Sequence, residues 1–218
     1  MGYRVEVWGE WALFSRPELK VERMSYDVMT PSAARGLLES IFFHPGMRWR
    51  IDKIHVLAPI QFAAVRRNEV TQRVLASDIR RLMTEGGGKS CIVTKDCIAQ
   101  RASLLLKDVR YVIDAHFDMT ERAAPTDNEG KFADIIRRRL EKGQFYSQPY
   151  FGCREFPANF QPWTGGEMPN PNADRELGLM LYDMDYTDPK NITPMYFRAA
   201  LRGGAVNVPA WDSGEVLQ

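Results

Sequence analysis

The sequence predicts an α+β protein: a ferredoxin-like N-terminal domain with a basic insertion, followed by a small C-terminal antiparallel β-sheet. Two amphipathic helical patterns alternate with strand patterns in the order β-α-β, insertion, β-α-β, which is the split arrangement of that fold. The last quarter of the chain contains strand patterns around a Gly203-Gly204 turn. We therefore expect two domains, residues 1–162 and residues 163–218.

The first β-α-β unit is predicted from alternation and from helix-boundary residues. Thr30 supplies an N-cap and Pro31 a first-turn proline, and apolar residues then recur at helical spacing until Ile41. The run His44-Pro45-Gly46 prevents the helix from continuing. The predicted elements are a strand over 3–8, a helix over 33–41, a strand over 47–57 and a second strand over 61–65.

Residues 66–101 differ in kind from their surroundings. They are basic, contain Gly86-Gly87-Gly88 and show weak periodicity, which predicts an extended, mobile insertion or a hairpin. The Gly-Lys-Ser at 88–90 is not a phosphate-binding loop, because that motif requires a glycine where Met83 stands.

The second unit opens with the clearest strand pattern of the chain, over 109–117. Thr126 and Glu129 then have the spacing of a capping box, and a helical apolar stripe runs to Leu140 and ends at Gly143. Residues 150–156 are predicted to return as a strand. After a stretch rich in proline and glycine (157–172), the predicted C-terminal strands cover 177–185, 195–201 and 205–208.

Composition excludes several protein classes. Of the 218 residues, 44% are hydrophobic and 26% charged, as in ordinary globular proteins. No apolar run is long enough to cross a bilayer, and the N-terminus lacks the apolar region of a signal peptide, so we expect a cytoplasmic protein. The three cysteines include no Cys-x-x-Cys pair and the three histidines are far apart, so we expect no metal or other cofactor.

The net charge of +1 hides an asymmetry along the chain. Residues 163–218 carry four basic and eight acidic side chains, or −4, so residues 1–162 carry +5. Within them, the stretch 48–101 holds eleven basic and five acidic residues, or +6. This distribution favours a polyanionic partner for the N-terminal part, with an ordinary solvated surface as the alternative.

Two side chains are candidates for phosphate chemistry. Lys131 lies in the first turn of the second predicted helix, where lysine and exposed N–H groups together suit an anion; the alternative is a solvated lysine offset by Asp127 and Glu129. His44 closes the first helix, and its ordinary pKa of about 6.5 suits proton transfer. The alternative is a histidine that caps the helix carbonyls. His116 is better explained as a hydrogen-bonded structural residue.

Several motifs in order resemble one family. The runs Ser25–Pro31 and Ala34–Ile41 resemble the first half of the subtype-d Cas-five proteins of type I-C CRISPR systems, in the RAMP superfamily. Arg66–Glu69, Asp127–Lys131 and Gly152–Phe156 resemble its later signatures. The resemblance spans essentially the whole chain and implies a ferredoxin-like domain of RNA-recognition type.

The resemblance also implies an activity, which is cleavage of CRISPR precursor RNA within its repeats without a metal ion. A ribose 2′-OH attacks the adjacent phosphate, and the protein then stays on the 5′ handle as a subunit of the interference complex. The family uses a tyrosine at the end of the first helix and a Lys-His pair opening the second. Here Lys131 is retained, whereas Phe42 and Phe132 occupy the other two positions.

His44 and Tyr26 are the nearest candidates to replace the missing groups, so the predicted catalytic residues are Lys131, His44 and Tyr26. Arginine suits bidentate phosphate contact and base stacking. The predicted RNA-binding residues are Arg23, Arg35, Arg66, Arg67, Arg73, Arg101 and Arg154.

The expected partners are CRISPR precursor RNA, the 5′ handle of mature CRISPR RNA, and the backbone and large subunits of the type I-C interference complex, with no membrane. The alternative function is a noncatalytic subunit that grips the RNA handle and contacts neighbouring subunits. Nonspecific binding of duplex DNA through the basic insertion is compatible with both, because phosphate contacts carry little sequence information.

Overall fold

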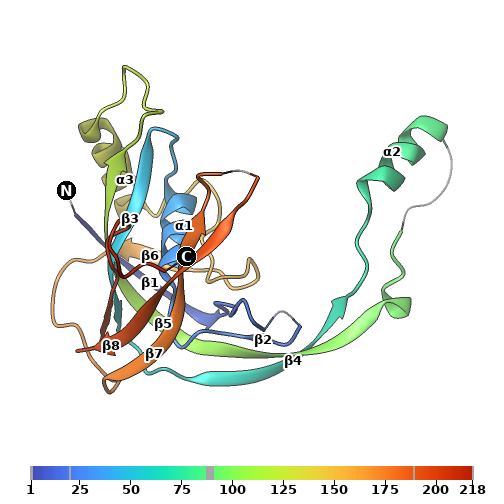
Figure 1. The fold of residues 1–218 in the computed structure, drawn as a ribbon, viewed down its shortest axis with the longest axis horizontal. Coiled ribbons are helices and arrows are strands. Elements are labelled where there is room, and N and C mark those ends of the chain that lie inside the picture. Colours follow the sequence, from blue (N-terminus) through green and yellow to red (C-terminus); the bar gives the residue numbers. More distant parts are fainter. Residues whose placement is uncertain (1, 20, 87–90, 189, 218) are drawn as a thin grey trace.

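A computed structural model describes residues 2–19, 21–86, 91–188 and 190–217. It contains a mostly antiparallel sheet and, in the described residues, three α-helices (Figure 1). The elements are, in chain order, β1 (Tyr3–Ala12), β2 (Arg23–Met24), α1 (Pro31–Ile41), β3 (Met47–Val56), β4 (Phe62–Val70), α2 (Ala76–Glu85), the 3₁₀ helix η1 (Thr94–Asp96), β5 (Ile98–Met119), α3 (Glu129–Lys142), β6 (Asn159–Pro162), β7 (Arg175–Asp185), β8 (Thr193–Arg202) and β9 (Ala205–Asn207).

The strand order is β6-β1-β5-β3-β9-β8-β7, with β2 and β4 pairing along β5. The strands β1, β3 and β5 lie where the two predicted β-α-β units place strands, and the predicted α+β class is confirmed. β6 lies outside both predicted units, and β2 and α2 were not predicted. The C-terminal strands continue from the edge of β3 through β9. The division into domains at residue 162 stays a prediction.

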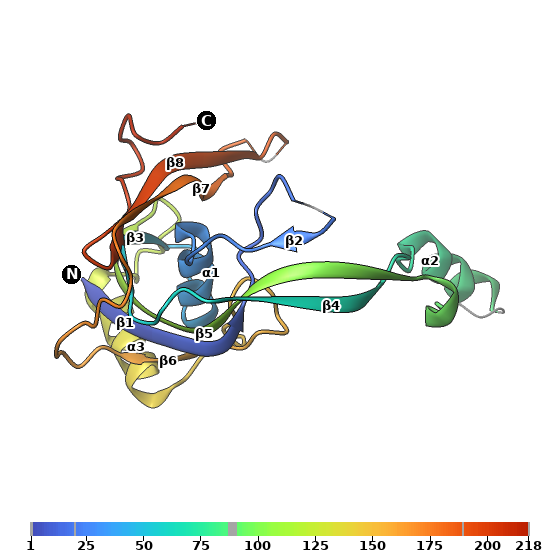
Figure 2. The same ribbon diagram turned by 90° about the horizontal axis from the view of Figure 1, so that it is seen from below.

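Helix α1 forms as the sequence predicts. The Thr30 side chain accepts a hydrogen bond from the Ala33 N–H at 3.2 Å, and Pro31 occupies the first turn. The apolar stripe through Leu37, Leu38 and Ile41 is buried against β3 and β7. Figure 2 shows the helix between the β7–β8 pair and the β1–β5 part of the sheet.

Helix α3 begins with a different cap from the predicted one. The Asn128 side chain accepts a hydrogen bond from the Lys131 N–H at 2.9 Å, so the Thr126–Glu129 capping box is wrong. Asn128 caps the helix instead, because it directly precedes the first helical residue and its side-chain oxygen reaches the N–H of the third. The predicted end is confirmed, with Gly143 at a φ of 62°.

The insertion is a long hairpin with a helix at its tip, which we call the arm (residues 62–106). β4 and β5 pair from Phe62–Leu106 outward to Val70–Ile98, and Figure 1 shows the hairpin extending from the sheet to α2. The predicted hairpin is confirmed, whereas α2 was not predicted, because none of its residues is buried and no side chain caps it. The Gly-Lys-Ser at 88–90 lies outside the described residues.

The strand predicted at 150–156 is wrong. Residues 151–156 form a turn in which the Phe151 N–H donates to the Phe156 carbonyl, and β6 pairs with β1 instead. Gly152 has a φ of 78°, and a Cβ there would lie 2.0 Å from the Leu13 carbonyl oxygen. This glycine is therefore required by the close approach of its own chain.

Candidate active site at the start of helix α3

The loop before α3 holds a charged pair at the helix N-terminus. Lys131 Nζ lies 2.8 Å from Asp127 Oδ1, and Asp127 also accepts a hydrogen bond from the Ala124 N–H at 2.9 Å. The Asp127 side chain is 3% exposed, whereas that of Lys131 is 46% exposed. The Lys131 hydrogen bond and the Ala124 N–H lower the pKa of the Asp127 carboxyl group. The carboxylate thus holds an accessible ammonium group in place.

His44 reaches the same site from the end of α1. Its Nδ1 lies 3.8 Å from Asp127 Oδ2 and accepts a hydrogen bond from the Gly46 N–H at 3.0 Å. Because Nδ1 acts as an acceptor, the neutral ring carries its proton on Nε2. His44 is therefore oriented as a hydrogen-bond donor, and the alternative of a histidine capping the helix carbonyls is not what the structure shows.

Tyr26 lies away from this pair. It precedes α1, whereas His44 follows that helix, and its 1% exposed side chain lies beneath the Arg16 guanidinium group, 4.5 Å from the ring centre. Burial raises the pKa of its hydroxyl group, with a further contribution from Glu18. The structure therefore brings Lys131 and His44 together but not Tyr26, and the catalytic role of all three stays a prediction.

Three of the seven candidate arginines are held by carboxylates. Arg35 contacts Asp183 at 2.6 and 2.8 Å and Glu39 at 2.6 Å, which ties α1 to β7. Arg67 pairs with Glu155, so the arm is joined to the 151–156 turn. Arg23 pairs with Glu69 of β4 at 3.1 Å.

The other four arginines have no ion pair within the described part of the chain. They are Arg66, Arg73, Arg101 and Arg154. The first three lie on the arm, and Arg154 lies in the 151–156 turn. The arginines available to a ligand are therefore those of the arm and of this turn.

The remaining histidines have structural partners. His116 Nδ1 lies 2.9 Å from Asp52, as a hydrogen-bonded residue should, and His55 Nε2 lies 3.2 Å from Asp114. Among the described residues, no group of three or more His, Cys, Asp or Glu side chains is arranged to hold a metal ion. None of the described helices has the length and apolar character required to span a membrane.

A family model described as CRISPR-associated protein (Cas_Cas5), Cas_Cas5d, matches residues 2–209. The chain belongs to the Cas5d family. A Mannheimia succiniciproducens protein named CRISPR pre-crRNA endoribonuclease Cas5d is 43% identical over 220 residues, covering 98% of this chain and 97% of the relative. A Thermus thermophilus protein of the same name is 42% identical over 224 residues, covering 95% and 91%.

Solved structures share the fold of this Cas5d-family protein. A crystal structure of a CRISPR-associated protein has a TM-score of 0.71 at 19% identity, covering 100% of this chain and 97% of the other. A chain of a CRISPR RNA-guided surveillance complex has a TM-score of 0.50 at 13% identity, covering 89% and 90%.

Phe42 and Phe132, which the family resemblance would align with a tyrosine and a histidine, are core residues in this chain. Phe42 is 6% and Phe132 1% exposed, and their ring centres are 5.9 Å apart. The His44 ring lies 4.8 Å from the Phe132 ring. The His44 imidazole, from the segment after α1, therefore contacts the ring at the start of α3 that this resemblance would align with the histidine.

Asp127 has a role that its place in the sequence does not reveal. The sequence offered it only as a charge that offsets Lys131, and this contact is confirmed. Its approach to His44 could not be predicted, because the two residues meet only when α1 and α3 pack on the same sheet. The available signal was the spacing Asp127–Lys131, which places a carboxylate within reach of the first helical turn.

Proposed function

We propose that this protein is an endoribonuclease that cleaves CRISPR precursor RNA within its repeats without a metal ion and then stays on the 5′ handle. The observation that carries the proposal is the Lys131–Asp127–His44 cluster at the N-terminus of α3. It occurs in a chain that shares 42–43% identity with two curated pre-crRNA endoribonucleases over nearly its full length.

The cluster suits attack of a ribose 2′-OH on the adjacent phosphate. As the new P–O2′ bond forms and the P–O5′ bond breaks, negative charge accumulates on the nonbridging oxygens. The Lys131 ammonium group and the His44 Nε2–H are donors for that charge. Solvent accepts the 2′-OH proton and protonates the leaving 5′ oxygen, so the products are a 2′,3′-cyclic phosphate and a 5′-OH. This mechanism does not need a tyrosine at Phe42 or a histidine at Phe132, because solvent moves the protons and charge stabilisation alone retains much of a catalyst's effect.

The proposal assigns the RNA to the ferredoxin-like N-terminal domain of RNA-recognition type, residues 1–162, and treats residues 163–218 as the small C-terminal β-domain. The unpaired arginines of the arm supply phosphate contacts, and the charge of +5 over residues 1–162 favours RNA binding by this part of the chain. In the cytoplasm, the bound handle would keep the protein in the interference complex beside its backbone and large subunits. Duplex DNA is a further candidate ligand of the arm.

The test is cleavage of repeat RNA by purified protein in excess chelator. We expect a single cut that leaves a 2′,3′-cyclic phosphate, identified by mass spectrometry. The same RNA with a 2′-deoxy substitution at the mapped scissile nucleotide should remain intact, because its nucleophile is missing. Binding of both RNAs without any cut would instead support the noncatalytic handle-binding subunit.

A further inference from the structure

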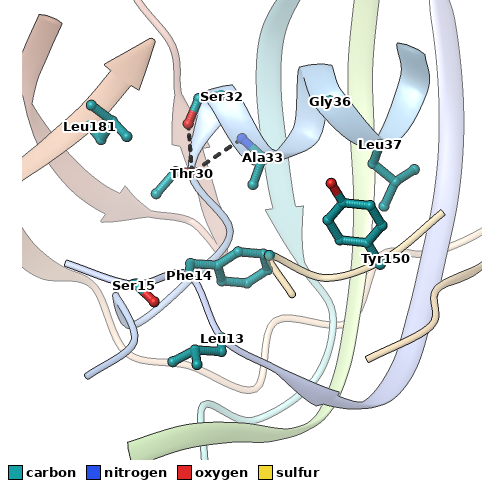
Figure 3. A pocket seen from close by; sticks show the side chains of 11 residues that line it. Leu13, Phe14, Ser15, Thr30, Ser32, Ala33, Gly36, Leu37, Tyr150 and Leu181 are labelled. Atoms are coloured by element: carbon teal, nitrogen blue, oxygen red, sulfur yellow. Dashed lines mark hydrogen bonds between the residues drawn. The ribbon is translucent and has the colours of Figure 1, made fainter. Parts of the chain in front are cut away.

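A groove runs along the exposed side of α1 toward the candidate active site. It consists of two hollows of about 340 and 580 Å³ that share Gly36 and Tyr150 as lining residues. Figure 3 shows the first hollow, with Tyr150 reaching toward Gly36 and Leu37 of the helix. The second hollow extends to Phe43, the residue directly before His44.

We propose that this groove, which we call the α1 groove, is a stacking site for unpaired bases of the RNA substrate. Phe43, Tyr146 and Tyr150 would hold the bases, and Arg154 a flanking phosphate. The inference rests on the proposed function for the identity of the RNA and adds to it a specific binding surface next to the cleavage centre. Three independent features of the groove support it.

The first feature is the glycine in the middle of α1. Glycine is a poor helix former compared with alanine, so an interior helical glycine needs a reason. A Cβ at Gly36 would meet nothing within 4 Å, so no contact inside the described protein requires its absence. Gly36 does, however, line both hollows. A ligand that approaches the helix backbone closely at this position accounts for the glycine.

The second feature is the exposure of the aromatic side chains. Tyr146 is 83%, Phe43 58% and Tyr150 36% exposed, although large aromatic rings are normally covered in a folded protein. The backbone at Tyr146 is fixed, since the N–H groups of Tyr146 and Ser147 both donate to the Ser40 carbonyl, at 2.9 and 3.1 Å. Proteins stack unpaired bases on exposed aromatic rings of this kind.

The third feature is the charge of the rim. Arg154 lines the groove and has no carboxylate partner within the described residues. The one acidic lining residue of the second hollow, Glu39, has its carboxylate on Arg35 at 2.6 Å. The groove therefore presents a free cation and aromatic faces without a free anion, which suits a nucleic-acid strand better than an acidic or apolar peptide.

The first test measures binding of a repeat RNA that carries a 2′-O-methyl group on every nucleotide and therefore cannot be cut. Tyr146→Ala should weaken binding about tenfold, and Tyr146→Phe should retain it, because the ring and not the hydroxyl group stacks. Tyr186→Ala is the matched control, since Tyr186 is 52% exposed beyond the end of β7. Equal affinities for Tyr146→Ala and Tyr186→Ala would overturn the proposal.

The second test uses Gly36. Gly36→Ala should raise the melting temperature and Gly36→Gln should leave the protein folded, yet both should weaken RNA binding, with Gln the more severe because it fills the groove. Stability and binding would then move in opposite directions, which a folding defect cannot produce. Wild-type affinity in folded Gly36→Gln would overturn the proposal.

A scan of single abasic sites along the same RNA identifies the stacked nucleotides. One or two abasic positions should weaken wild-type binding and have no further effect on Tyr146→Ala, because the same contact has already been lost. Independent, additive losses at every position would count against stacking in the α1 groove. The deciding readout of each test is RNA binding, so a wild-type protein that binds the RNA but never cuts it would refute the proposed nuclease activity and leave this inference standing.

Discussion

Helices α2 and α3 are both amphipathic, yet they have opposite relations to the rest of the molecule. On α3 the apolar residues Phe132, Ile136 and Leu140 are buried, and Asn128 caps the first turn. On α2 no residue is buried and no side chain caps the start. An apolar stripe therefore packs into the core only where the sheet covers it, and α2 forms a helix without such cover. The part of the molecule outside the arm holds the candidate catalytic residues in fixed positions, and the arm extends outward and carries unpaired basic residues.

Substitutions in the two helices test whether burial distinguishes α3 from α2. Phe132→Ala should lower the free energy of unfolding by about 3–5 kcal/mol, because a fully buried ring is replaced by a cavity. Met83→Ala on α2 should change it by less than about 0.5 kcal/mol, since Met83 is 80% exposed. Urea unfolding measures both. Similar losses for the two variants would show that α2 is covered in solution.

Lys131→Ala should slow single-turnover cleavage about 10²–10³-fold, because a charged donor to the transition state is lost. Binding should weaken only a few-fold, by about 1 kcal/mol, since many phosphate contacts remain. Lys142→Ala at the other end of α3 is the matched control. Normal cleavage by Lys131→Ala would show that the active site does not lie at the start of α3.

His44→Ala tests the second donor in the same assay. We expect a clear loss of rate, smaller than that of Lys131→Ala, because a neutral N–H donor stabilises charge less than an ammonium group. His55→Ala serves as the comparison, since His55 pairs with Asp114 elsewhere on the sheet. If His44→Ala cleaves normally, His44 only orders the end of α1 through Gly46.

The arm should dominate the salt dependence of RNA binding. Each phosphate neutralised contributes about −0.7 to the slope of log affinity against log salt for a single strand. The test variant replaces three arm arginines with glutamine: Arg66, Arg73 and Arg101. Its slope should become less steep by about two. The control replaces three arginines of β7 and β8: Arg175, Arg198 and Arg202. An equal change in both would assign the effect to net charge and not to the arm.

Limited proteolysis tests whether the arm is mobile without a ligand. The free protein should be cut first within residues 71–97, where few of the described side chains are buried, and bound RNA should slow this cut. Mass spectrometry of the first fragments identifies the site. An arm that resists protease in the free protein would contradict the predicted mobility.

The smallest effect concerns acid stability. Because the fold lowers the pKa of Asp127, its pairing stabilises the protein above the ordinary carboxyl pKa of about 3.9 and is lost as the pH falls through the lowered value. The difference in melting temperature between wild type and Asp127→Asn should therefore be present at pH 7 and shrink below about pH 4. Asp134→Asn on the exposed face of α3 is the control. A constant difference at all pH values would show that the carboxylate charge does not matter.

The parts of the fold with local causes could be predicted from the sequence alone. The Thr30 cap with Pro31 began α1, the apolar stripe and Gly143 defined α3, and alternation located the C-terminal strands. Each of these depends on residues within one or two turns of each other, so the pattern contains the physical reason.

Features that depend on residues far apart in the chain follow only from how the elements pack together. Asp127 meets His44 because α1 and α3 cover one sheet, and Gly152 is required by the Leu13 carbonyl of another segment. Arg35 was expected to bind RNA, yet its guanidinium group lies on Asp183 of β7. Long-range pairing of this kind leaves no periodic signal in either segment, because each partner is determined by packing and not by its neighbours in sequence.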